Sequence, residues 1–210
     1  MEKPAPYAAP QAAGTFVRSM MHAWSGLLYT VTHQRNMRMH LISALLVAQV
    51  GQGVPLGLAE KVTMLFCVML VMFAEMVNSA LEQLVDLAIQ QFDEKAKLTK
   101  DIAAAGVLVL AIGTVTIFAA ILVHNAETIF ANPGAITRQV MVGVPITFFG
   151  GALMHESLKP KWLDVLFALG GLAAWGVSLA WTESYVFWGM TLGLLVVMAN
   201  VAWLRQRSRA

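Results

Sequence analysis

The stretch that decides the fold is EMVNSALEQLVD at residues 75–86, which directly follows the apolar run 62–74. On an α-helix, which advances about 100° per residue, its acids and Asn78 fall on one stripe covering about a quarter of the circumference. A charge at bilayer depth costs roughly 2.5–3.5 kcal/mol on insertion scales. The stripe therefore predicts contact with a water-filled cleft, a metal ion or a polar partner.

The overall composition is that of a membrane protein. The mean hydropathy is +0.67, and only 12% of the residues are charged, whereas soluble domains carry about 25%. The small net charge of +2 argues against a nucleic-acid partner. The single cysteine, Cys67, excludes an intrachain disulfide and a metal site built from several thiolates.

Apolar segments of membrane-spanning length recur along the chain. We expect spans at 39–58, 62–87, 102–124, 140–155, 162–181 and 185–204, the fourth being the shortest. Before them, residues 16–34 combine apolar side chains at helical spacing with basic ones, which is typical of an amphipathic helix in the membrane interface. The alternative is that this helix only packs on the bundle. The sequence thus predicts an all-α integral membrane protein with an N-terminal interfacial amphipathic helix and about six transmembrane helices.

The distribution of basic residues predicts the orientation. With the N-terminus inside, 12 of the 14 Lys and Arg residues fall on the cytosolic side, and only Lys61 and Arg138 fall outside. By the positive-inside rule, both termini of this multi-pass protein are expected in the cytosol. Residues 1–15, rich in Pro and Ala, are expected to form a disordered tail.

The chemistry is expected where the acidic stripe meets the charged loop 90–101. Lys97 and Lys100 share a face at the start of the following helix, where free backbone N–H groups also favour an anion. Acids that can hold Mg²⁺ beside lysines that can hold phosphate suit phosphoryl transfer. An ion pathway or structural ion pairs are the alternatives, although ion pairs alone do not explain why Glu75 and Asn78 lie deeper in the membrane.

Several motifs resemble one known family. They are E-x-x-N-S-A-L-E-x-x-V-D from Glu75, A-K-x-x-K-D-x-A-A from Ala96, G-L-x-Y from Gly26 and R-N-x-R-x-H-L from Arg35. The first two resemble the signature of the small prokaryotic lipid kinases, the diacylglycerol kinase and undecaprenol kinase family. The last two look like its Gram-positive undecaprenol kinase branch. The resemblance covers about residues 16–123.

The resemblance implies a fold and a reaction. The family has an interfacial helix and three spans per subunit, assembled as a homotrimer with active sites between subunits. Its members transfer the γ-phosphate of MgATP to a lipid alcohol at the cytosolic face of the bacterial inner (plasma) membrane. The expected partners are therefore ATP with Mg²⁺, membrane lipids and a lipid alcohol, undecaprenol first and diacylglycerol as the alternative.

The resemblance also implies a role for each matching residue. Glu75 would be the general base on the lipid hydroxyl, with Asn78 and Ser79 lining the site. Glu82 would hold Mg²⁺ together with the residue at position 34. The residues assigned to ATP are Asp86, Lys97, Lys100 and Asp101.

The chain departs from the family at two positions. It has Gln34 where a glutamate usually serves as second Mg²⁺ ligand, and Asp93 where the loop usually has a histidine. These changes leave open reduced activity, a shifted metal site or a non-catalytic membrane scaffold derived from the family.

We expect a tail at 1–15, a lipid kinase-like membrane domain at 16–124 and a three-span extension of unknown role at 125–210.

Overall fold

The computed structural model describes residues 16–155 and 160–207, so the tail expected at 1–15 lies outside the described residues. Within these ranges the chain is entirely helical, as predicted. The elements are α1 (Phe16–His33), α2 (Arg35–Gly53), α3 (Leu58–Ala88), α4 (Glu94–His124), α5 (Ala126–Ala131), α6 (Pro133–Met154), α7 (Lys161–Ser178), the short 3-10 helix η1 (Leu179–Trp181) and α8 (Tyr185–Arg207).

Five segments in the described part of the chain are long and apolar enough to cross a membrane: α3, α4, α6, α7 with η1, and α8. The remaining expected span, 39–58, corresponds to α2, which is not among the five. This helix lies in the middle of the bundle against α3, α6 and α8. Its buried Gln49 and Gln52 therefore face protein rather than lipid. The helix ends at Gly53 because Val54 precedes Pro55 and adopts an extended conformation.

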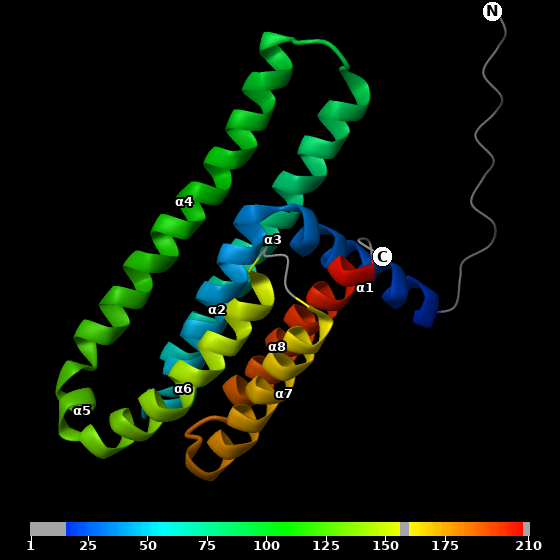
Figure 1. Cartoon of the computed structure of the whole chain (residues 1–210). Coiled ribbons are helices and arrows are strands. Elements are labelled where there is room, and N and C mark those ends of the chain that lie inside the picture. Colours follow the sequence, from blue (N-terminus) through cyan, green and yellow to red (C-terminus); the bar gives the residue numbers. More distant parts are fainter. Residues whose placement is uncertain (1–15, 156–159, 208–210) are drawn as a thin grey trace, which may run out of the picture.

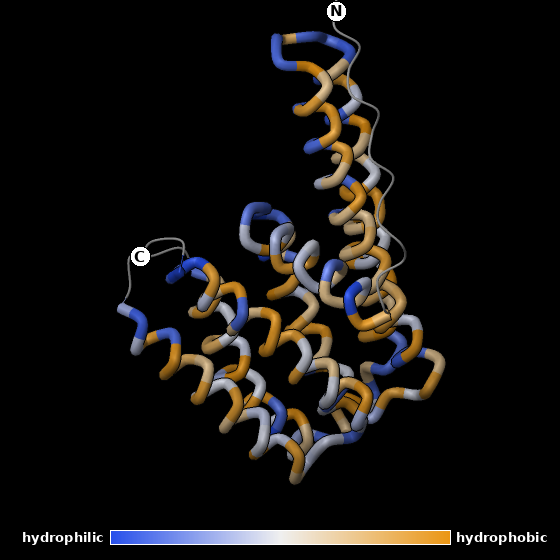
Figure 2. Tube along the Cα trace, turned by 90° about the vertical axis from the view of Figure 1, so that its right-hand side faces the viewer, coloured by the Kyte–Doolittle hydropathy of each residue, from blue (hydrophilic) through white to orange (hydrophobic). Residues whose placement is uncertain are grey.

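The α3–α4 hairpin projects beyond the rest of the bundle (Figure 1). Each of its helices has 31 residues, which corresponds to about 46 Å, whereas the hydrocarbon core of a bilayer is about 30 Å thick. Figure 2 shows hydrophilic residues gathered at the tip of the hairpin. The excess length therefore carries the tip into water.

Helix α1 runs obliquely across the bundle, next to the end of α8 (Figure 1). It buries Leu28 and Val31 against the bundle and exposes Phe16, Met20 and Met21. An exposed apolar face next to a packed one is what a helix in the membrane interface needs.

A single hydrophobic core joins the kinase-like segment to the extension. Leu41 and Leu45 of α2 are fully buried in one cluster with Ile146 of α6 and with Phe187 and Met198 of α8. Helix α2 thus gains much of its burial from residues 125–210.

A polar link reinforces this junction inside the membrane. The Gln49 side chain donates to Thr191 Oγ1 at 3.1 Å and accepts from the Gln139 amide at 3.0 Å. Hydrogen bonds between membrane helices average about 0.6 kcal/mol. The link therefore fixes the register of α2, α6 and α8 more than it stabilises them.

Gly51 tests this packing, because an added Cβ there would lie 2.6 Å from the Phe187 ring. Gly51→Leu is expected to destabilise the folded protein by about 1–3 kcal/mol through overpacking. A Cβ at Gly193, in contrast, meets nothing within 4 Å, so Gly193→Leu is the control. Unfolding midpoints in detergent check the prediction, and equal midpoints for the two variants would contradict it.

Candidate functional site

The site begins at the elbow between α1 and α2. Arg38, which is buried, donates from Nη1 to the carbonyl oxygens of Thr32 at 3.0 Å and Val31 at 3.4 Å. These carbonyls belong to the last turn of α1, where a cation is favourable. Gln34, between the helices, is extended. The elbow therefore holds Gln34 close to α3.

An acid and two amides form a cluster at this elbow. Glu82 accepts from Gln34 Nε2 through Oε2 at 3.2 Å and from Asn78 Nδ2 through Oε1 at 3.0 Å. Each of its carboxylate oxygens thus has one amide donor. The structure brings together three of the four residues that the sequence linked to the metal and the site lining.

A cavity of about 230 Å³ lies next to this cluster, between α2, α3 and α4. Its polar lining consists of Glu75, Asn78, Asn36 and His40. Glu75 is only 1% exposed, and its Oε2 lies 4.0 Å from His40 Nε2. Glu75 lies roughly 26 Å along α3 from Leu58, which places it near one edge of the hydrocarbon layer.

Two oxygens at this cavity lack a hydrogen-bond partner. They are Oε2 of Glu75 and Oδ1 of Asn78, both buried. Buried polar groups in proteins are normally satisfied, so these atoms indicate a place for a polar ligand. The cavity can therefore receive a hydroxyl group or a cation beside Glu75.

The donor set fits Mg²⁺ with an incoming phosphate. Carboxylate and amide oxygens are hard ligands, and Mg²⁺ in proteins is commonly bound by one or two carboxylates together with substrate phosphates. No group of three or more His, Cys, Asp and Glu side chains that could hold a metal occurs in the described ranges. Glu82 with the oxygens of Asn78 and Gln34 is consistent with such a shared site.

The four residues assigned to ATP lie closer to the tip of the hairpin. Lys100 Nζ forms an ion pair with Asp86 Oδ1, and both side chains are at least one third exposed. Exposed pairs of this kind contribute about 0–1 kcal/mol to stability. Stabilisation of the fold therefore does not by itself explain why these two charged residues are present. Lys97 and Asp101 are exposed, and their side chains are available to a soluble anion or nucleotide.

Asp93, one of the two departures, has a structural role. Its Oδ1 accepts from the backbone N–H of Ala96 at 2.9 Å, which caps α4. Asp is among the preferred N-cap residues. The substitution therefore fixes the start of the helix that carries Lys97 and Lys100.

Some site residues differ from those singled out in the sequence. Ser79 is buried beside Asn78 but does not border the cavity. Asn36 and His40 do border it, although no role was assigned to them. The available signal was an ionisable His40 in an expected span, since such residues are functional candidates by default.

The chain is similar to proteins of one known family over about half of its length. Residues 21–122 match the model of the prokaryotic diacylglycerol kinase family. The chain is 35% identical to a diacylglycerol kinase of Synechocystis sp. over 55% of this chain and 67% of that protein. It is 32% identical to an undecaprenol kinase of Bacillus subtilis over 46% of this chain and 79% of that protein. An Escherichia coli diacylglycerol kinase is 27% identical over 44% and 76%, respectively. No solved structure matches significantly.

Arg38→Met is expected to loosen the elbow, because hydrogen bonds from a charged donor contribute about 1.5–3 kcal/mol. Hydrogen exchange of the α1 amides, followed by mass spectrometry in detergent, should accelerate. Arg35, which is exposed, supplies the control: Arg35→Met should leave α1 exchange unchanged. Unaltered exchange in Arg38→Met would mean that the elbow is held by other contacts.

Proposed function

Since the chain belongs to the prokaryotic diacylglycerol kinase family of ATP-dependent membrane lipid kinases, we propose that it phosphorylates a long-chain lipid alcohol, undecaprenol first, at the cytosolic face of a bacterial membrane. The observation that carries this proposal is the cavity bordered by Glu75 and Asn78, whose buried oxygens lack partners. It lies near a bilayer edge, where a lipid hydroxyl and a soluble nucleotide can meet.

Glu75 is proposed as the general base. It accepts the proton of the lipid hydroxyl while the hydroxyl oxygen forms a bond to the γ-phosphorus of ATP. The bond from that phosphorus to the bridging oxygen breaks, and ADP leaves. His40 Nε2 lies 4.0 Å from Glu75 Oε2, near the carboxylate but beyond hydrogen-bond distance.

Positioning and charge neutralisation supply most of the catalysis in phosphoryl transfer. Glu82, with oxygens of Asn78 and Gln34, would hold Mg²⁺, which neutralises phosphate charge when bound. Lys97, Lys100 and Asp101 are proposed to hold the nucleotide, with Asp86 orienting Lys100 through their ion pair.

The choice of acceptor rests on relatives whose names differ. The relative from Bacillus subtilis is named undecaprenol kinase, whereas those from Synechocystis sp. and Escherichia coli are named diacylglycerol kinase. Diacylglycerol is therefore the second candidate. The deciding experiment is ATP-dependent phosphorylation of the two alcohols side by side in detergent, and transfer to neither by folded protein would favour the scaffold alternative.

The arrangement in the membrane is part of the proposal. We place both termini in the cytosol, because 12 of the 14 Lys and Arg residues then lie inside. Residues 16–124 carry the chemistry, and 125–210 form the extension. We further propose a homotrimer, a hypothesis supported by the exposed apolar surface of α4, which buries little besides Val107 and Ile121 within one chain.

Glu75→Gln is expected to lower kcat by about 10²–10⁴-fold, because an amide cannot accept the proton. ATP affinity should stay near that of the unaltered protein, since the nucleotide is assigned to other residues. Glu60→Gln, at the opposite end of α3, is the control and should keep full activity. A near-native rate for Glu75→Gln would remove Glu75 from this role.

Gln34→Glu is expected to lower the Mg²⁺ concentration needed for half-maximal activity by several-fold. It places a second carboxylate beside Glu82, where the Gln34 amide now donates at 3.2 Å, and Mg²⁺ favours charged oxygen ligands. Gln83→Glu adds the same charge at the position after Glu82, which is exposed, and should leave the Mg²⁺ titration unchanged. Identical titrations for all three proteins would place the metal elsewhere.

A further inference from the structure

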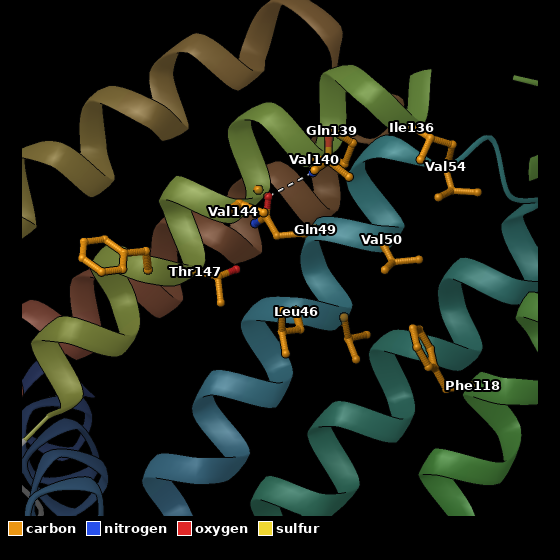
Figure 3. A pocket seen from close by; sticks show the side chains of 13 residues that line it. Leu46, Gln49, Val50, Val54, Phe118, Ile136, Gln139, Val140, Val144 and Thr147 are labelled. Carbon is orange, nitrogen blue, oxygen red and sulfur yellow. Dashed lines mark hydrogen bonds between the residues drawn. The ribbon is translucent and has the colours of Figure 1, made fainter. Parts of the chain in front are cut away.

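A second cavity lies deeper in the membrane, between α2, α4 and α6. Its volume is about 580 Å³, within the range of about 300–1,000 Å³ typical of small-molecule sites. Figure 3 shows Leu46 and Val50 of α2 between Thr147 of α6 and Phe118 of α4. Its lining is apolar except for Thr147 and the linked Gln49 and Gln139.

This cavity is in line with the candidate active site along α2. Met39 and His40 border the cavity at Glu75, and Leu46, Val47 and Val50 border the deeper one. At about 100° per residue, these positions fall on a single stripe about one third of the circumference wide. The same face of α2 therefore serves both cavities.

Helix α4 repeats this pattern. Ala104, Leu108 and Ala111 border the cavity at Glu75, and Phe118 borders the deeper one. These four residues again lie on one helical face. Helix α4 packs mainly on α3 and not closely on α2. Helices α2 and α4 run in the same direction along the bundle, and α3 passes behind α2 (Figure 1). The two cavities thus lie along the same faces of α2 and α4.

We propose that the two cavities are the ends of one groove between α2 and α4, and that this groove holds the hydrocarbon chain of the lipid acceptor, with the hydroxyl at Glu75 and the far end of the chain against α6. The inference rests on the proposed kinase function and names the substrate class: an alcohol whose chain passes the bilayer midplane. The extension thereby contributes a wall of the acceptor site.

The length of the groove argues for a long chain. Val54, the first residue after α2, is 14 residues from His40, which corresponds to about 21 Å along the helix. Half of the hydrocarbon layer is about 15 Å. The deeper cavity begins at Leu46, about 9 Å along α2 from His40. An acyl chain confined to one leaflet therefore ends partway along this cavity, whereas a polyprenyl chain reaches its far end.

The groove orients the acceptor more than it attracts it. Lipid tails are as apolar as the cavity walls, so transfer from bilayer to groove gives little hydrophobic gain. Holding the chain instead restricts where the hydroxyl lies relative to Glu75, and misplacement at a reacting centre costs up to about 10²-fold in rate. Contact between the far end of a long chain and α6 should therefore raise kcat/KM, and a chain too short to reach α6 should not gain from it.

Val144→Trp tests the proposal, because Val144 borders the deeper cavity and is largely exposed, so the larger ring fills the cavity without disturbing the core. We expect kcat/KM for undecaprenol to fall about tenfold or more. A short polyprenol that ends before Leu46, about 9 Å along α2 from His40, should react with the variant as it does with the unaltered protein. Met141→Trp, on the same helix but outside the cavity lining, should change neither rate. An unchanged kcat/KM for undecaprenol in Val144→Trp, or an equal fractional loss of kcat/KM with both alcohols, would overturn the proposal.

A cross-linking experiment tests occupancy independently of catalysis. Photoreactive benzoylphenylalanine at position 144 of the full-length protein, irradiated in vesicles containing undecaprenol, should acquire the mass of that alcohol. The same group at position 141 should label bilayer phospholipid instead. A cross-link from position 144 to a second copy of the chain, or to phospholipid alone, would overturn the proposal. If lipid phosphorylation is absent but the adduct forms, the kinase function fails and the chain-binding groove stands.

Discussion

The cost of exposing a carboxylate to lipid shapes the arrangement around Glu75. A charge at bilayer depth is unfavourable by roughly 2.5–3.5 kcal/mol even on insertion scales, and Glu75 is followed by further acids on the same face of α3. The structure meets this constraint by turning the stripe toward α2 and α4. Glu75 then lies beside His40, and Glu82 accepts hydrogen bonds from Gln34 and Asn78. The cavity at Glu75 is bordered by the helices that shield its carboxylate from lipid.

Helix α2 connects this polar region to the rest of the molecule. One part of its surface borders both cavities, while other positions pack into the core formed with α6 and α8. Because α2 is covered by protein, it tolerates Gln49 and Gln52 at depths where a lipid-facing helix would not. The kinase-like segment is thereby covered by a second layer of helices, and α6 of this layer borders the deeper cavity.

The two departures from the family pattern have different structural consequences. Asp93 caps α4 through the Ala96 amide, so a change in the loop serves the helix that follows. Gln34 remains beside Glu82 and donates a hydrogen bond to it. An amide at this position lets the two side chains stay in contact without a cation between them, whereas two carboxylates would repel each other.

The sequence by itself determined the helical class, nearly all of the helices and the polar stripe, because hydropathy and a period of 3.6 residues are local properties. It also linked Gln34, Asn78 and Glu82 through family motifs, and these residues do meet. Local patterns could not place Asn36 and His40 at the cavity or separate Ser79 from it, since that depends on how α2 and α3 are rotated against each other. They gave no sign that the extension packs on α2, because such packing depends on the complementary shapes of apolar surfaces. Only the tertiary structure decided that α2, whose own hydropathy is modest, lies in the middle of the bundle, because burial by neighbouring helices replaces the apolarity that lipid would demand.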